Sequence, residues 1–318
     1  MKYNKYIIIF CIIVIFLSIH YFYNKEIEKL NNMSVGQLGN ILDSYFTAIA
    51  LTFYDEKDFV FDKCEYNIYN SSDSFYDELP KFLKCDMEIK NKLHELPDDF
   101  MNNLKTSHRH NDSWVISDNN SYQYWKIMKP TIHRILNNLF EKYNLIQNVK
   151  YPIIHFRCSD VPFARHEKYY MQKFQFYKDS LMELKSKNVN IDKFSILTGM
   201  DHKCSSENSK MCNIYIDMLR IFLHEMNVET EVEKNANNLE DFAKLFYAPA
   251  VITTGSSFAF MSAFFGNGIY ITACTKNNNN CKTDDNFIKT KYRIWHNDVK
   301  DYYDKDEMKT HLYNENVQ

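Results

Sequence analysis

The feature that most constrains the fold is a regular alternation of short strand-like segments and helical segments after residue 150. The expected strands begin at Tyr151 and cover Phe194–Thr198, Glu229–Glu233 and Ala250–Thr253, and the expected helices cover Phe174–Lys187, Asn213–Met226 and Leu239–Phe246. Strands and helices that alternate at this spacing form parallel βαβ units. The sequence therefore predicts a doubly wound α/β sheet that binds ligands at the carboxyl ends of its strands.

The chain before Lys150 has a different, helix-rich character. Its spacing of apolar residues predicts helices over Ile41–Phe53, Ile89–Leu104 and Ser121–Tyr143, with Pro130 bending or interrupting the third, and a strand over Asp58–Tyr69. We expect a domain boundary near Lys150, which separates residues 25–149 from residues 150–318.

The N-terminus carries an almost entirely apolar run over Tyr6–Tyr23, which is long enough to cross a bilayer as a helix. The alternative is a cleaved signal peptide, but the run lacks a small-x-small cleavage site, so an uncleaved anchor is favoured. Lys2 and Lys5 precede the run and place the N-terminus in the cytoplasm by the positive-inside rule. Residues 1–24 are therefore expected to be a cytoplasmic tail and membrane anchor of type II topology.

Glycosylation sequons and cysteine spacing both fit a lumenal body. The sequons begin at Asn32, Asn70, Asn111 and Asn119. Six cysteines fall into near pairs that local disulfides would join, namely Cys64 with Cys85, Cys204 with Cys212, and Cys274 with Cys281. Six reduced thiols remain the alternative, because connectivity cannot be read from sequence. No Cys-x-x-Cys pair is present, so no metal site is expected.

The charge balance argues against a nucleic-acid partner. The chain has 38 Lys and Arg against 41 Asp and Glu, which gives a formal net charge of -3. There is no general basic field to hold a polyanion.

The strongest candidate site is the segment His155-Phe156-Arg157-Cys158-Ser159-Asp160 at the end of the strand that begins near Tyr151. Strand alternation places Ile153, His155 and Arg157 on one face, so an imidazole and a guanidinium project together at the carboxyl end. A planar, permanently charged guanidinium suits a leaving phosphate, which gains negative charge when a sugar is transferred. The alternative is a structural ion pair between Arg157 and Asp160, with His155 packing nearby.

Two weaker signals involve glycine and serine. The segment from Ala250 predicts a strand, a turn at Gly255 and a helix, with Ser256 and Ser257 at the helix start, where N–H groups and hydroxyls can receive a phosphate. An ordinary serine N-cap is the commoner use of such residues. The second signal is Gly36-x-x-Gly39-Asn40, which by itself indicates a turn, because the Lys-Ser/Thr of a phosphate-binding P-loop does not follow.

The order of these segments resembles the superfamily of alpha-1,2-, alpha-1,6- and protein O-fucosyltransferases, and the alpha-1,2 group most. The matching segments, spread over about residues 34–266, are Gly36-Gln37-Leu38-Gly39-Asn40, His155-x-Arg157-x-x-Asp160, Phe176-Tyr177-Lys178, Phe194-Ser195-Ile196-Leu197-Thr198, and Glu240-Asp241-Phe242 with Ser256-Ser257-Phe258. Several motifs in one order are far more specific than any one of them.

The resemblance implies a GT-B fold, in which two Rossmann-like domains enclose a donor crevice. Residues 25–149 would be the acceptor-side α/β domain and residues 150–318 the nucleotide-sugar-binding domain. The implied reaction is an inverting transfer from GDP-fucose to a hydroxyl of a glycan or glycoprotein, without metal or other cofactor. The implied location is the Golgi or ER membrane, with the catalytic part in the lumen.

The resemblance also assigns roles to residues. His155 and Arg157 would contact the donor diphosphate and, with Asp160, would form the catalytic group. The other implied donor-binding residues are Gly36, Gly39, Asn40, Asp201, Asp241, Ser256, Ser257 and Phe258, with Asp241 or Asp201 on guanine or ribose. Candidates for a general base are Asp160, His166 and Glu167, which as an alternative are surface charges on a loop.

Two other functions stay open at this point. One is a glycosyltransferase that uses a different nucleotide sugar. The other is a catalytically inactive glycan-binding membrane protein of the same fold, in which Cys158 stands in place of a second arginine of the motif.

Overall fold

The computed structural model of the chain describes residues 38–55, 87–106, 119–145, 148–157, 171–199, 206–234, 238–273, 287–290 and 312–313. The predicted anchor over residues 6–23 and the predicted strand over residues 58–69 lie outside these ranges. Within them, no helix has both the length and the apolar character that crossing a bilayer requires.

Parallel strands form a six-stranded sheet in the part of the chain that the structure describes. The strands are β1 (Ile153–His155), β2 (Lys193–Leu197), β3 (Glu229–Glu233), β4 (Ala250–Thr253), β5 (Ile269–Ala273) and β6 (Phe287–Thr290). Their order across the sheet is β3-β2-β1-β4-β5-β6, and every neighbouring pair is parallel. This order is that of doubly wound, Rossmann-like sheets, so the predicted α/β class with a parallel sheet is confirmed. The two-domain GT-B arrangement stays a prediction.

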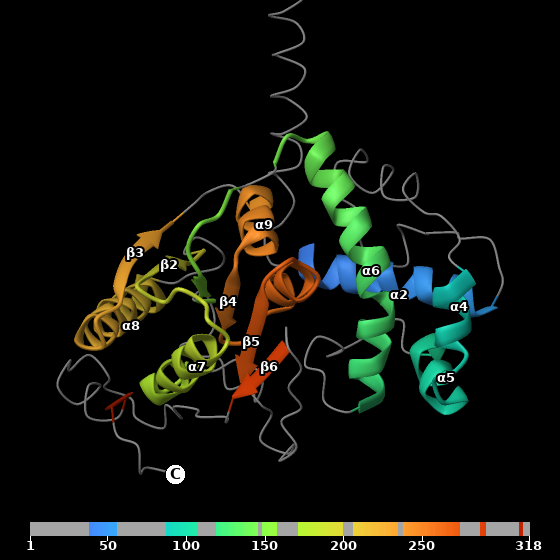
Figure 1. The fold of residues 1–318 in the computed structure, drawn as a ribbon, viewed down its shortest axis with the longest axis horizontal. Helices are drawn as coiled ribbons and strands as arrows, with labels where there is room; N and C mark the ends of the chain where they lie inside the picture. The colour runs from blue at the N-terminus through green and yellow to red at the C-terminus, as the bar shows by residue number, and fades with distance from the viewer. Residues whose placement is uncertain are drawn as a thin grey trace, which may run out of the picture.

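Helices cover both faces of the sheet (Figure 1). The helices α7 (Phe174–Ser186) and α8 (Ser206–Glu225) follow β1 and β2, and α9 (Asn238–Tyr247), α10 (Ser257–Ala259) and the π-helix η4 (Phe260–Phe264) flank β4. Successive strand residues alternate between two hydrophobic clusters, because side chains of a strand point to opposite faces. Ile154, Ile196, Ile252 and Ile271 pack with α7 and α8. Ile153, Leu197, Val251 and Tyr270 pack with α9 and η4. We call these the α7/α8 face and the α9/η4 face.

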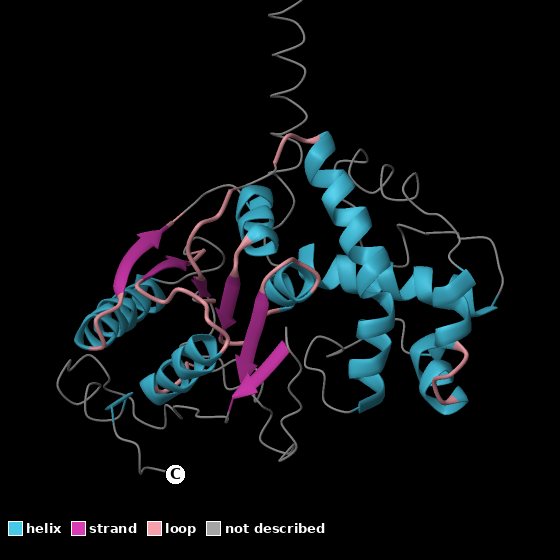
Figure 2. Ribbon diagram, viewed as in Figure 1, coloured by secondary structure: helices cyan, strands magenta, loops and turns pink. Residues whose placement is uncertain are grey.

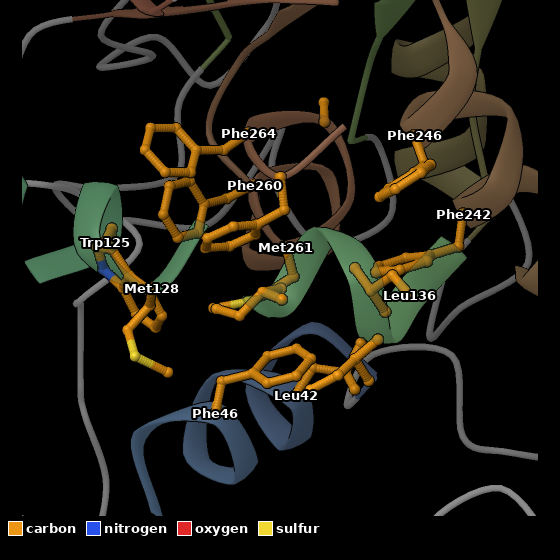
Figure 3. Packing of buried hydrophobic residues seen from close by; sticks show 14 of the residues in the cluster. Leu42, Phe46, Trp125, Met128, Leu136, Phe242, Phe246, Phe260, Met261 and Phe264 are labelled. Carbon is orange, nitrogen blue, oxygen red and sulfur yellow. The ribbon is translucent and has the colours of Figure 1, made fainter. Parts of the chain in front are cut away.

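The described residues before Lys150 form helices, and these pack onto the α9/η4 face. They are α2 (Leu38–Asp55), α4 (Met87–Leu93), α5 (Asp98–Thr106) and α6 (Asn119–Lys142), which lie to the right of the sheet in Figure 2. Figure 3 shows side chains of α2 and α6 meeting those of α9 and η4. The ring of Trp125 lies 5.6 Å from that of Phe260, and the ring of Phe140 lies 5.1 Å from that of Phe246. Burial of each such side chain contributes roughly 1.5–3 kcal/mol, so this contact fixes α6 against the sheet.

The two prolines in the helical part have different effects on the helices. The expected helix over Ile89–Leu104 is divided into α4 and α5 just before and after Pro97, because the residue before a proline avoids helical angles. Pro130, in contrast, lies within a continuous α6. Pro130 and Lys126, one turn earlier, are both exposed, so water can solvate the carbonyl group that proline leaves without an N–H donor. Buried Met128 and Ile132 hold the helix on either side.

Gly39, in the first turn of α2, touches the backbone of α10. A Cβ atom at Gly39 would overlap the backbone nitrogen of Phe258 and the carbonyl carbon of Ser257. At Gly199, after β2, a Cβ atom would have no neighbour within 4 Å. The small size of Gly39 therefore sets how closely α2 approaches the end of β4.

We predict that Gly39→Ala lowers the free energy of unfolding by about 1–3 kcal/mol, because the clash with backbone atoms outweighs the gain in helix propensity. Gly199→Ala is the matched control and should change it by less than about 0.5 kcal/mol. Urea unfolding of the purified full-length protein, followed by circular dichroism, measures both. Equal stability of the two variants would show that α2 does not pack this closely.

Candidate functional site

The carboxyl ends of β1 and β4 meet where the chain order of the sheet reverses. From β1 the chain continues to β2 and β3 on one side, and then crosses to β4 on the other. In doubly wound sheets, ligands bind beyond the carboxyl ends of the strands at this reversal point. Here β1 ends at His155, which is the direct cross-strand partner of Thr253 at the end of β4. The topology therefore places the predicted His155 segment at the expected ligand-binding edge.

His155 is a buried, neutral histidine. Its ring stacks on Phe258, with centroids 5.9 Å apart, and Phe258 in turn packs edge-on against Phe242 of α9 at 5.1 Å. Burial, reinforced by the positive charge of Arg157, lowers the pKa of His155 from 6.5 to about 4. The imidazole is therefore uncharged at neutral pH, with one nitrogen that donates and one that accepts a hydrogen bond. The positive character predicted for this strand end rests on Arg157, not on both side chains.

Arg157 follows β1 and is half-buried. Its guanidinium group is close enough to His155 to affect the pKa of the imidazole, which fits the prediction that the two side chains project from the same strand end. Asp160, the suggested ion-pair partner of Arg157, lies outside the described residues.

Two buried polar atoms flank the reversal point without a hydrogen-bond partner among the described residues. They are Nδ1 of His155 and Oγ1 of Thr253. Such an atom in a native protein calls for an explanation, because an unmet buried polar group costs about 1–3 kcal/mol. A polar ligand at this edge would supply the missing partners.

The turn after β4 connects the strand to a helix whose N-cap serine makes no side-chain capping hydrogen bond. Gly255 has a φ of 97°, which is in the left-handed region that favours glycine. Ser256 occupies the N-cap position of α10 but makes no capping hydrogen bond through its side chain. Ser256 therefore does not act as an ordinary N-cap through its hydroxyl group. The regular helix expected after Ser257 is instead one short α-helical turn followed by η4, and π-helical segments are frequent at functional sites.

The first motif of the chain reaches the same place from α2. Gly39 lies against the backbone of Ser257 and Phe258, and Phe258 stacks on His155. Three predicted segments, more than a hundred residues apart in sequence, therefore meet at the end of β1 and β4. Asn40, next to Gly39, is exposed.

Of the remaining predicted site residues, the structure describes one, Asp241. Asp241 is buried in the first turn of α9, directly before Phe242, whose ring contacts Phe258. The others lie outside the described residues, so their predicted roles stay predictions. They are Gly36, Asp160, His166, Glu167 and Asp201.

Sequence reasoning missed two polar residues near the same edge. Thr198 follows β2, is fully buried, and has no hydrogen-bond partner for Oγ1 in the described part of the chain. Gln172, just before α7, is 2% exposed and likewise has no partner for Oε1. A polar residue at the end of an apolar strand is the signal that identifies Thr198. Nothing in the local pattern singles out Gln172.

Comparisons with known proteins and a search for metal ligands gave no further information on the site. Comparison of the chain with protein-family models, curated proteins and solved structures finds no match. Within the described ranges, no group of three or more His, Cys, Asp or Glu side chains is placed to hold a metal ion. The expectation of a metal-independent reaction stays a prediction.

The burial of His155 predicts a specific acid sensitivity. Because the pKa is about 4 in the folded protein and 6.5 in the unfolded chain, the unfolded chain binds the proton more tightly. The stabilising contribution is complete above pH 6.5 and is lost as the pH falls toward 4. We expect a loss on the order of 2 kcal/mol across this interval, and a smaller loss in His155→Gln. Urea unfolding at pH 7 and pH 4.5 tests this, and an equal pH dependence in both proteins would contradict it.

Proposed function

We propose that the protein is a glycosyltransferase that binds the diphosphate of a nucleotide sugar at the carboxyl edge of β1 and β4. The observation that carries the proposal is the pair of buried, unpartnered polar atoms of His155 and Thr253 at the reversal point of the sheet. The neighbouring Arg157 and the turn that presents Ser256 and Ser257 supply groups that suit phosphate oxygens.

The chemistry follows from the groups at this edge. When a sugar is transferred, the bond between its anomeric carbon and the β-phosphate oxygen breaks, and negative charge grows on the phosphate. The guanidinium of Arg157 can donate two parallel hydrogen bonds to that phosphate and stabilise the charge. Neutral His155 donates a single hydrogen bond from one nitrogen, and the hydroxyls of Ser256 and Ser257 can donate others.

The donor, the acceptor and the location are finer parts of the same proposal. GDP-fucose as donor, a glycan hydroxyl as acceptor, inversion at the anomeric carbon and the GT-B arrangement rest on the order of motifs shared with the fucosyltransferases. A type II membrane anchor and a lumenal catalytic part rest on the apolar run and the sequons near the N-terminus. Cys212 is disulfide-bonded, which fits an oxidising compartment. Its partner lies outside the described residues, because Cys212 is the only cysteine within them.

The proposal predicts that the full-length purified protein binds GDP-fucose in preference to GDP-mannose and UDP-sugars, and slowly releases GDP. Arg157→Ala should weaken binding roughly tenfold to hundredfold, because the charge-assisted hydrogen bonds to phosphate are lost. The control is Arg220→Ala, which removes an exposed arginine of α8 and should leave binding unchanged. Isothermal titration calorimetry measures binding, and chromatography measures GDP release.

The possible results separate the candidate functions. Preference for another nucleotide sugar would keep the transferase and change the donor. Nucleotide binding without release of GDP in the presence of glycans would favour an inactive glycan-binding protein. If the folded protein binds no nucleotide, the transferase proposal is wrong.

A further inference from the structure

A second pair of unmet polar atoms lies at the carboxyl edge, on the α7/α8 face. The atoms are Oε1 of Gln172 and Oγ1 of Thr198, and neither has a hydrogen-bond partner among the described residues. The side chains are at least nine-tenths buried, with exposed fractions of 2% and 0%. This pair is distinct from His155 and Thr253, which strand alternation places on the α9/η4 face.

A series of contacts connects the two residues across one patch of the edge. The hydroxyl of Tyr215, from α8, donates a hydrogen bond of 2.5 Å to the backbone carbonyl oxygen of Gln172. The ring of Tyr215 stacks on Phe156, with centroids 4.7 Å apart. Phe156 directly follows β1, and its N–H donates to the carbonyl oxygen of Leu197, the residue before Thr198, at 2.9 Å. Gln172 and Thr198 therefore belong to the region where β1 and β2 end.

The face on which Thr198 lies follows from the strand ladder. The N–H of Thr198 donates to the carbonyl oxygen of Glu233 at 3.2 Å, so the extended pairing of β2 continues through this residue. Ile196 packs in the cluster of α7 and α8, and Leu197 packs in the cluster of α9 and η4. Alternation then returns Thr198 to the α7/α8 face, the same face as Tyr215.

The two atoms restrict the chemistry of what can bind against them. An amide oxygen only accepts hydrogen bonds, so Oε1 of Gln172 needs a donor. Phosphate and carboxylate oxygens in their charged forms only accept and cannot meet this need. A sugar hydroxyl can donate to Oε1 of Gln172, and a neighbouring hydroxyl can exchange a hydrogen bond with Thr198, which both donates and accepts.

We propose that Gln172 and Thr198 form a subsite for the hydroxyl groups of a sugar ring, next to the diphosphate site. This inference rests on the proposed function, since a nucleotide sugar carries sugar hydroxyls on either side of its diphosphate. The hydroxyls come either from the ribose of the nucleotide or from the transferred sugar, and suitable ligands separate these two sources.

The first test concerns stability without ligand. Thr198→Val and Gln172→Met keep the side-chain size and remove the unmet polar atom, so each should raise the melting temperature of the full-length protein by about 2 °C or more. Thr131→Val is the matched control, because Thr131, in α6, also has a buried hydroxyl without a hydrogen-bond partner among the described residues. This control should be stabilised in the same way. A lower melting temperature for both Thr198→Val and Gln172→Met would show that these polar atoms serve the folded structure, and would overturn the proposal.

The second test concerns ligand binding, measured by isothermal titration calorimetry with GDP-fucose, GDP and 2′-deoxy-GDP. Thr198→Val and Gln172→Met should each weaken GDP-fucose binding roughly three- to tenfold, whereas Thr131→Val should leave it unchanged. If the variants lose as much affinity for GDP as for GDP-fucose, and if only the wild type binds 2′-deoxy-GDP more weakly than GDP, the subsite holds the ribose. A loss confined to GDP-fucose identifies the transferred sugar.

The tests separate this proposal from the proposed function. If the wild type and both variants bind GDP-fucose equally well, the subsite is wrong and the nucleotide-sugar site stands. If the wild type binds none of the three ligands, the proposed function fails, and the sugar subsite, which depends on it, fails with it whatever the melting temperatures show.

Discussion

The rest of the structure depends on the burial of β1 between two parallel neighbours. All three residues of this strand are buried, and both of its edges are hydrogen-bonded, to β2 and to β4. Ile154 is covered by α7 and α8, and Ile153 is covered by α9, η4 and the helices that precede the sheet. A strand enclosed in this way can present polar chemistry only at its ends. The carboxyl end, with His155 and Arg157, is therefore where the fold can bind a polar ligand.

The same enclosure decides the charge of that end. Desolvation disfavours the charged form of a buried imidazole, and the guanidinium charge of Arg157 acts in the same direction, so the pKa of His155 is lowered. His155 and Arg157, two positions apart, thus provide one neutral hydrogen-bonding group and one permanent cation. A neutral imidazole stacked on Phe258 keeps its orientation at neutral pH, so the edge offers a fixed donor beside a half-buried charge.

Local pattern predicted the strands β1 to β4, but it missed β5 and β6 and was insufficient for much of the site. The strand over Ala250–Thr253 has its predicted bounds, because an apolar run between helices leaves little freedom. The polar strand over Glu229–Glu233 also has its predicted bounds. The sequence left open whether Pro130 bends or interrupts its helix, and α6 continues through it because solvent exposure, a tertiary property, decides whether a proline interrupts a helix. The meeting of Gly39 with the end of β4 was expected only from the family resemblance, because no local pattern encodes a contact across more than two hundred residues. Gln172 was missed because its unmet amide oxygen exists only after the chain has folded.

The two pairs of unmet atoms differ in a way that bears on how a ligand would be oriented. Next to the first pair, the guanidinium of Arg157, which follows β1, only donates hydrogen bonds, so an acceptor such as a phosphate oxygen suits it. In the second pair, Oε1 of Gln172, which precedes α7, only accepts, so it requires a donor such as a hydroxyl. A molecule with acceptors at one end and donors at the other satisfies both in one orientation and neither in the reverse. Because an unmet buried acceptor costs about 1–3 kcal/mol, an inverted ligand that leaves Oε1 of Gln172 without a donor would be disfavoured by the fold itself.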